Sequence, residues 1–267
     1  MTGPRLAVVD AFTDRPFRGN PAGVVLLAAG RPAVADAWMA SVARELNVAA
    51  TAFVQERPEG GHDLRWFTPS AEITLCGHAT HAATHVLGAS TVFHTARGQL
   101  RAGHLGDRIE LDLPARVPTP IARDTALARA LGTTEVYAVA RCEDDLVVEL
   151  GAAEDVRGLR PDLRALGLVG LRGCCVTAPG DRPGIDIVSR FFVPTAVVPE
   201  DPVTGSAHCM LAPWWAPRLG RDELVGEQAS SRGGIVGMRL DGPRVHLLGQ
   251  AVTVWSGELA GATEVTG

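Results

Sequence analysis

The sequence predicts an α+β protein of two pseudo-symmetric lobes, each a barrel-like β-sheet curled around one central helix. The first reason is an internal repeat, because the segment from Arg65 to Leu87 recurs as Arg190 to Leu211. The second is that short strand-like runs outnumber helical ones in both halves. The third is that each half contains one helix-forming segment rich in small residues. Self-similarity of this kind in a chain of 267 residues is what duplication of a half-chain produces.

The repeat has two parts, with matched residues 125 positions apart in the first and 128 apart in the second. The first part pairs Arg65, Phe67, Pro69 and Ala71 with Arg190, Phe192, Pro194 and Ala196. After a three-residue insertion, Gly77-His78-Ala79 matches Gly205-Ser206-Ala207. The matching order and residue classes favour duplication over a coincidence in an Ala- and Gly-rich chain.

Each copy has the same local pattern. An extended run led by aromatic residues meets a proline, which cannot donate a hydrogen bond and therefore ends the strand. A loop with an acidic residue follows, and then glycine and small residues begin a helix that Gly88 is expected to end in the first copy. A helix start offers free N–H groups and a partial positive charge, which suit a carboxylate. We therefore expect the helix starts at Gly77 and Gly205 to face one another across a cleft.

The remaining elements of the first half follow from shorter patterns. Strands are expected at 6–12, 24–27, 51–55, 91–94, 98–101 and 108–113, and a helix at 35–46. The loop from Phe17 to Gly23 contains Asn-Pro and two glycines, which is typical of a tight turn with exposed N–H groups. Gly19 and Asn20 in this loop are candidates to help hold a substrate anion, although a simple hairpin would also explain the pattern.

The second half begins after a proline-rich linker from Pro114 to Pro120. We therefore expect an N-terminal lobe at 1–115 and a C-terminal lobe at 116–267, whose final strands could pack back on the first. Strands are expected at 136–140, 146–150, 174–177, 185–192, 235–240, 244–248 and 251–254, and helices at 124–131 and 161–166. Trp214 and Trp215 are expected to follow the second central helix.

Composition narrows the range of functions. The net charge is −5 and no basic cluster occurs, so a nucleic-acid partner is not expected. No apolar run approaches the length of a membrane span, and no secretory signal is recognised at the start. The cysteines lack zinc-type spacing, so we expect reduced thiols in the cytoplasm. They are Cys76, Cys142, Cys174, Cys175 and Cys209.

Four runs resemble one known family: DAFTDRPFRGNPAGVVLL, FTPSAEITLCGHATHAATHVL, EDPVTGSAHCML and GQAVTVWSGEL. Together they are similar to the phenazine-biosynthesis PhzF-like isomerases, which have the diaminopimelate-epimerase-like fold. The resemblance covers about residues 6–260. It implies a homodimer with an active site between the lobes and no metal or organic cofactor. It also implies proton transfer between carbons, or inversion of a carbon, in small amino-acid-like or cyclic carboxylic acids.

The resemblance places His78, Asp201 and Ser206 at positions of family active-site residues. It also exposes one departure, because Ala50 stands where the family motif S-E-T-A-F has its glutamate. That glutamate is the residue expected to carry the proton, and an alanine cannot do so. The usual family mechanism is therefore not expected to operate here without change.

Racemases of the same fold use two facing cysteines, and only one of those positions is a cysteine here. Cys76 occupies the first, whereas Thr204 precedes Gly205 in the second copy. A symmetric two-thiol racemase is therefore not expected. Cys76 could be a thiolate with a pKa lowered by the helix start, or a buried packing residue. Asp201 could equally be a helix cap and His78 a residue satisfied by the backbone.

Three histidines, His78, His81 and His85, lie on one face of the expected helix and invite a metal-site interpretation. They span about 10 Å at 1.5 Å per residue, which is too long for a single ion. A pair such as His81 and His85 is geometrically possible. A polar flank of the helix or a subunit contact explains the spacing better, so no metal is expected.

These observations favour a metal-free isomerase of a small carboxylate in a specialised biosynthetic pathway. We expect His78 to accept the proton and Asp201 to orient it or the substrate, with Cys76 and, less readily, Glu72 as other candidate bases. The expected substrate-binding residues are Ser206, Gly77, Gly205, Thr204, Asn20 and Gly19. Two alternatives stay open: a small-carboxylate-binding protein that lost catalysis with the glutamate, and an epimerase or dehydratase using Cys76 and Asp201.

Overall fold

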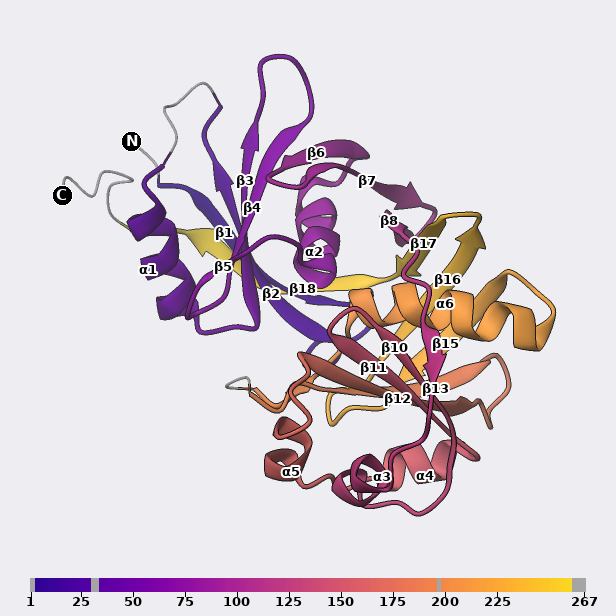
Figure 1. Cartoon of the computed structure of the whole chain (residues 1–267). Coiled ribbons are helices and arrows are strands. Elements are labelled where there is room, and N and C mark those ends of the chain that lie inside the picture. The colour runs from indigo at the N-terminus through magenta and orange to yellow at the C-terminus, as the bar shows by residue number, and fades with distance from the viewer. Residues whose placement is uncertain (1–2, 30–33, 196–197, 261–267) are drawn as a thin grey trace. The chain divides into compact units, whose positions relative to one another are not determined.

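The computed structural model describes residues 3–29, 34–195 and 198–260 (Figure 1). Ala196, matched above with Ala71, lies outside the described residues. The chain forms two compact units, one of residues up to Asp112 together with those from Leu248 onward, and one of Leu113–Leu247. The last described strand, β18 (Ala251–Glu258), pairs with β1 (Arg5–Ala11) and so belongs to the first unit.

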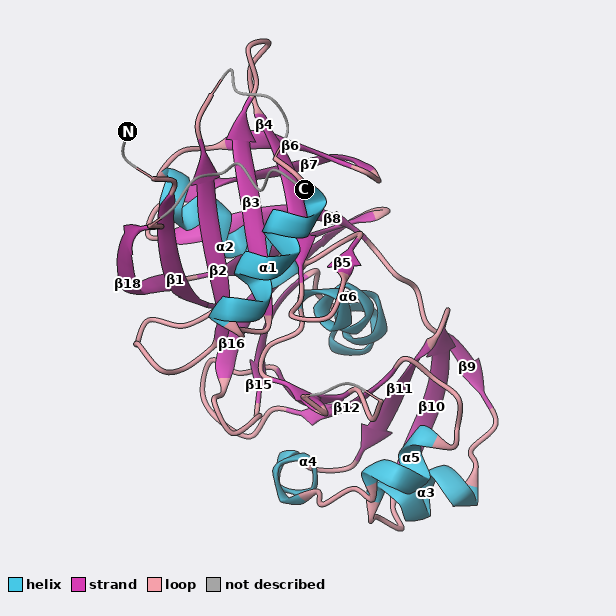
Figure 2. Ribbon diagram, turned by 90° about the vertical axis from the view of Figure 1, so that its left-hand side faces the viewer, coloured by secondary structure: helices cyan, strands magenta, loops and turns pink. Residues whose placement is uncertain are grey.

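The first unit is an α+β structure built on one sheet. From one edge its strands are β18, β1, β2 (Asn20–Leu27), β3 (Ala50–Glu56), β4 (His62–Phe67), β6 (Thr91–Thr95), β7 (Gly98–Leu105) and β8 (Arg108–Pro114), with the short β5 (Glu72–Ile73) on β4. α2 (Gly77–Leu87) packs on one face and α1 (Asp36–Leu46) on the other (Figure 2). The α1 side is a core of large residues that includes Trp38, Phe53 and Phe67.

The second unit repeats this plan. Its strands pair in the order β9 (Thr119–Ile121), β10 (Val136–Cys142), β11 (Asp145–Leu150), β12 (Gly173–Pro179), β13 (Ile187–Phe192), β15 (Glu223–Gln228) and β16 (Gly234–Asp241), with the short β14 (Glu200–Asp201) on β13. β17 (Arg244–Gly249) follows β16. α6 (Gly205–Leu219) takes the place of α2, and the short helices are α3 (Thr125–Leu131), α4 (Ala153–Gly158) and α5 (Leu163–Gly167).

The two units share one pairing pattern, which confirms the predicted duplication. The pairs β1/β2, β2/β3, β3/β4, β4/β6 and β6/β7 alternate between antiparallel and parallel, as do β10/β11, β11/β12, β12/β13, β13/β15 and β15/β16. Register fixes the matching of residues as well. Phe67 pairs with Glu72 and Phe192 with Glu200, so Glu200 is the counterpart of Glu72. The next residues then match Asp201 with Ile73 and Thr204 with Cys76.

The helices show the clearest differences from prediction. α2 begins at Gly77 and is ended by Gly88 with φ 67°, as expected. α6, however, continues through Pro213, so Trp214 and Trp215 lie inside it rather than after it. Both indoles are buried, and their N–H groups donate to Glu149 at 2.9 Å and Thr177 at 3.1 Å. Anchoring and burial of two large aromatic side chains outweigh the cost of a proline in the helix.

One loop prediction was also wrong, and part of the predicted linker is a strand. Asn20 to Gly23 belong to β2 rather than to a turn, because they pair in register with β1. The predicted linker ends in β9, which contains Pro120 and pairs with β10. Among the described residues, no helix is long and apolar enough to cross a membrane.

Candidate active site

The start of α2 brings two predicted catalytic residues into contact. Cys76 is the N-cap residue, with φ −146° and ψ 102°, and its side chain makes no capping hydrogen bond to the helix. Its sulfur lies 3.5 Å from Nδ1 of His78, and both side chains are buried. The Cys76 carbonyl accepts from the hydroxyl of Thr80 at 2.7 Å, which closes the first turn. A thiol and an imidazole thus meet at the end of a helix that offers N–H groups to an anion.

Burial determines the charge of His78. It lowers the pKa of this imidazole to about 4, so the side chain is neutral at pH 7. A neutral imidazole can accept a proton, as predicted, but the imidazolium that results is poorly solvated. The ordinary histidine pKa near 6.5 does not apply to His78, because that value belongs to a solvated side chain. A negatively charged ligand beside the ring would offset this cost.

The other histidines of α2 bind protein groups. Nε2 of His81 donates to the Gly249 carbonyl at 3.1 Å, and its ring centroid lies 4.3 Å from that of Phe12. Burial lowers the pKa of His81 to about 3. His85 contacts the Thr253 hydroxyl at 3.0 Å. No group of three or more His, Cys, Asp or Glu side chains within the described part of the chain is placed to hold a metal ion.

We expect exhaustive chelation to leave any activity of this protein unchanged. The physical reason is that His81 and His85 already direct their Nε2 atoms to partners on the neighbouring chain segments. The measurement is turnover and metal content of the enzyme before and after treatment with a strong chelator. Loss of a stoichiometric metal together with activity, and recovery of both on adding the metal back, would contradict this expectation.

Asn20 and Ala50 lie on the α2 face of the sheet. Side chains alternate along a strand, and Val25 of β2 and Phe53 of β3 belong to the core on the α1 side. Asn20 and Ala50 therefore point to the opposite face, where α2 packs, and both are buried. Ala50 pairs with Ala22 of β2. Gly19 has φ +60°, and a Cβ there would lie 2.1 Å from the Ala11 carbonyl, so the turn alone requires glycine.

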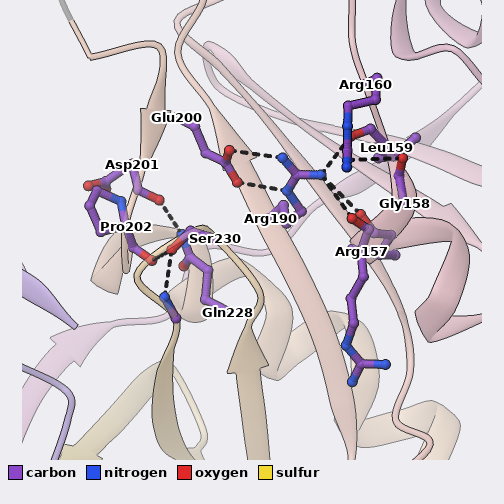
Figure 3. A network of polar contacts seen from close by, with 12 residues as sticks. Arg157, Gly158, Leu159, Arg160, Arg190, Glu200, Asp201, Pro202, Gln228 and Ser230 are labelled. Atoms are coloured by element: carbon purple, nitrogen blue, oxygen red, sulfur yellow. Dashed lines mark hydrogen bonds and ion pairs between the residues drawn. The ribbon is translucent and has the colours of Figure 1, made fainter. Parts of the chain in front are cut away.

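The start of α6 is built around the carboxylate of Asp201. Figure 3 shows Asp201 with the neighbouring Pro202, Gln228 and Ser230. Thr204 is the N-cap residue, and its hydroxyl donates to Oδ2 of Asp201 at 2.6 Å. Asp201 is therefore not the helix cap that the sequence allowed. The buried Gln228 accepts from the Thr204 N–H at 2.8 Å and donates to the Asp201 carbonyl at 2.7 Å. Ser230 donates to the Pro202 carbonyl at 2.8 Å.

Ser206 lies in the first turn of α6 next to Gly205. Its carbonyl accepts from Arg116 at 3.5 Å, and the Arg116 backbone N–H donates to Cys209 at 3.0 Å. Arg116 also pairs with the buried Asp145 at 2.9 Å. Arg116 comes from the segment predicted to be a simple linker. Sequence reasoning missed both Arg116 and Gln228, because neither belongs to a recognisable motif.

A duplicated ion pair supports the loop before each helix. Arg65 forms two hydrogen bonds to Glu72, both 2.8 Å, and Arg190 forms two to Glu200, at 2.7 and 2.9 Å. Each guanidinium also lies over a phenylalanine ring two residues along its strand. Glu72, a candidate base from the sequence, is therefore a structural ion-pair partner. Among the predicted site residues, the structure thus brings Cys76 into contact with His78, and Asp201 into contact with Thr204.

Comparisons with known proteins agree on one family. A family model described as "Phenazine biosynthesis-like protein" matches residues 9–257. An uncharacterized isomerase of Pseudomonas aeruginosa is 46% identical, over 94% of this chain and 96% of its own length. An uncharacterized isomerase of Halalkalibacterium halodurans is 41% identical, over 97% of this chain and 99% of its own length.

Solved structures show the same relationship. A PhzF-family protein of Enterococcus faecalis superposes with a TM-score of 0.90 at 36% identity, covering 96% of this chain and 99% of its own. A hydroxyproline epimerase of Agrobacterium vitis, solved with bound trans-4-hydroxy-L-proline, has a TM-score of 0.60 at 12% identity, covering 96% of this chain and 93% of its own. That second likeness concerns the fold alone.

Proposed function

Because the chain belongs to the phenazine biosynthesis-like family, we propose that it is an isomerase that moves a proton within a small carboxylic acid. Neither a metal nor an organic cofactor takes part in this proposal. The single observation that carries it is the contact of 3.5 Å between Cys76 and His78 at the start of α2. An acid–base pair placed at a helix start can bind a carboxylate and exchange a proton with the adjacent carbon.

His78 is the proton acceptor in this mechanism. If the imidazole directs its Nδ1–H to the Cys76 sulfur, Nε2 is left to take a proton from the substrate carbon. In an unsaturated acid the C–H bond breaks and its electron pair forms a new double bond to the next carbon. The electron pair of the old double bond then takes the proton back at a different carbon, so no water, oxidant or reductant is consumed. The substrate's negative charge stabilises the imidazolium that burial otherwise disfavours.

The remaining roles concern binding. The N–H groups at Gly77 and Gly205 and the Ser206 hydroxyl bind carboxylate oxygens, and Asn20 and Gly19 assist. Asp201, held by Thr204, accepts a hydrogen bond from a polar group of the substrate and fixes its orientation. The substrate is expected to belong to a specialised biosynthetic pathway.

One observation favours a second candidate function, that of a binding protein without catalysis. Ala50 is buried on the α2 face of β3 and places a methyl group where the family motif has a glutamate. In that case the helix starts still bind a carboxylate, but no proton is exchanged. Ala50→Glu then introduces the missing acid–base group.

Proton exchange separates the two candidates. Small amino-acid-like and cyclic carboxylic acids are incubated with the protein in D₂O, and deuterium incorporation is followed by NMR. His78→Gln or Asp201→Asn should lower kcat by about 100-fold or more. Cys76→Ala should cost little, because it removes only a hydrogen-bond partner of the ring and leaves the proton acceptor in place. His85→Gln, two turns along the same helix, is the matched control.

The outcomes assign the function. Loss of exchange in Cys76→Ala with retention in His78→Gln would make the thiol the base, as an epimerase or dehydratase requires. Binding without exchange in the parent, with exchange appearing in Ala50→Glu, would establish the binding protein. If neither binding nor exchange occurs with any acid tested, the proposed function is wrong.

A further inference from the structure

We propose that Gln228 is a positioning residue that fixes the carboxylate of Asp201 through the hydroxyl of Thr204. The three residues come from β14, the N-cap of α6 and the end of β15, and Figure 3 shows Gln228 beside Asp201. The relevance of this relay to catalysis rests on the proposed function, in which Asp201 orients the substrate. Its existence can be tested without any substrate.

The direction of each hydrogen bond follows from backbone chemistry. A backbone N–H can only donate, so the oxygen of the Gln228 amide faces the Thr204 N–H at 2.8 Å. A backbone carbonyl can only accept, so the nitrogen of the amide faces the Asp201 carbonyl at 2.7 Å. The orientation of the glutamine side chain is therefore determined from both ends.

The same logic extends to the Thr204 hydroxyl. It lies 3.2 Å from the Gln228 amide nitrogen, which donates to it, and 2.6 Å from Oδ2 of Asp201. A hydroxyl has one proton, and because it accepts from Gln228 it directs that proton to the carboxylate. Asp201 is thus an acceptor in this contact. A hydrogen bond to a charged acceptor is stronger than one between neutral groups and fixes one orientation of the side chain.

Burial makes the arrangement rigid. Gln228 is completely buried at the last position of β15, paired with Ser189 of β13. Leaving the polar groups of a buried amide without partners is costly, so the amide keeps its partners. In an ordinary capping box, a Glu or Gln of the helix itself accepts from the N-cap N–H. Here a strand residue 24 positions away does so, which ties the α6 start to the sheet.

The first repeat shows that this relay is not needed to start the helix. By strand register, the counterpart of Gln228 is Thr95, whose hydroxyl donates to Gly98 within its own hairpin. Cys76 replaces Thr204 and Ile73 replaces Asp201, yet α2 begins at the equivalent glycine. The Gln–Thr pair is thus present in the repeat that has a carboxylate to hold and absent from the other. A positioning role explains this distribution, and a purely structural role does not.

The test is the ¹³Cγ chemical shift of Asp201 in protein labelled at aspartate, measured at pH 7, where the protein is folded. In Thr204→Val this chemical shift should change, because the carboxylate loses a donated hydrogen bond. Thr204→Ser keeps the hydroxyl and should restore the parent chemical shift. Gln228→Met should change the Asp201 chemical shift and also speed hydrogen exchange at the Thr204 amide by about tenfold or more. Thr95→Val in the first repeat is the matched control and should change neither signal.

A catalytic readout completes the experiment. With any acid that the parent exchanges, Thr204→Val should lower kcat about tenfold with little change in KM, and Thr204→Ser should recover it. The relay is overturned if the Asp201 chemical shift at pH 7 is the same in the parent, Thr204→Val and Gln228→Met, all folded by their melting curves. Failure of the parent to exchange any acid refutes the proposed function instead and leaves the NMR result to decide the relay. Should Thr204→Val fail to fold, Gln228→Met against the Thr95→Val control decides it.

Discussion

Replacing Arg190 with methionine is expected to lower the free energy of unfolding by about 3–5 kcal/mol. The Arg190 side chain is only 11% exposed and bridges two elements. It holds Glu200 in the loop before α6 and donates to the Leu159 carbonyl at 2.9 Å, just beyond α4. Its removal leaves Glu200 unpaired and takes one donor away from the carbonyls at the end of α4.

The repeat supplies the matched control. Arg65→Met removes the same two-pronged contact to Glu72 and the contact to Asp36 on α1 at 2.7 Å, but the Arg65 side chain is 35% exposed. Water can solvate the groups left behind, so the expected loss is about 1 kcal/mol or less. Urea unfolding of both variants measures the difference. Equal losses would show that burial does not decide the strength of these pairs.

A double variant sharpens the interpretation. Arg190→Met combined with Glu200→Leu should recover much of the loss, because the penalty of a single change comes mainly from the unpaired partner. If the double variant is less stable than Arg190→Met alone, the loss comes from removing the attraction between Arg190 and Glu200. It does not then come from leaving Glu200 unpaired.

Stability is expected to fall steeply as the pH drops from about 6.5 to about 4. Burial lowers the pKa of His78 and His208 to about 4 and that of His81 to about 3. In the unfolded chain these side chains titrate near 6.5, so below that pH the unfolded state binds more protons than the folded state. Stability from these three sites is therefore present above 6.5 and lost on acidification. The loss by pH 4 is on the order of 10 kcal/mol, comparable with the whole stability of a typical domain.

Neutral replacements test the source of this loss. His81→Gln can keep the bond to Gly249, and His208→Asn can keep the bond of 2.8 Å from Nδ1 to the Thr204 carbonyl. Each should reduce the slope of unfolding free energy against pH by about 1.4 kcal/mol per unit between pH 4 and 6. Above pH 7.5, where the histidines are neutral, the slopes of variants and parent should coincide. Unchanged slopes in the acid range would assign the loss to other groups.

The spacing of apolar and small residues, together with the Gly and Pro residues that end elements, predicted most of the fold. The boundaries of α2 follow from small residues at helical spacing and a terminal glycine. The strand register confirms the repeat that the matching segments at Arg65 and Arg190 indicate. Trp214 and Trp215 were misplaced because two prolines are a local signal to end a helix, whereas the packing that overrides it is tertiary. β2 begins at Asn20, four residues before the predicted start. The reason is similar, because pairing with β1 extends the strand through the Asn-Pro sequence.

The site was predictable only where a motif names its residues. Cys76, His78 and Asp201 stand in such motifs, and the structure gives each a polar partner. Gln228 lies 24 residues beyond Thr204, on a strand with no motif, so only the folded register brings it to the helix start. The low pKa of His78 could not be predicted from the sequence either, because it results from burial in the folded core.

The starts of α2 and α6 show which residues the two copies of the repeat have in common and which have diverged. The arginine–glutamate pair and the glycine that begins each central helix have been kept in both copies. The positions that have diverged include Ile73 against Asp201, Cys76 against Thr204, His78 against Ser206, and Thr95 against Gln228. The scaffold of the ancestral half-chain thus survives in both copies, whereas the polar side chains at the two helix starts have diverged.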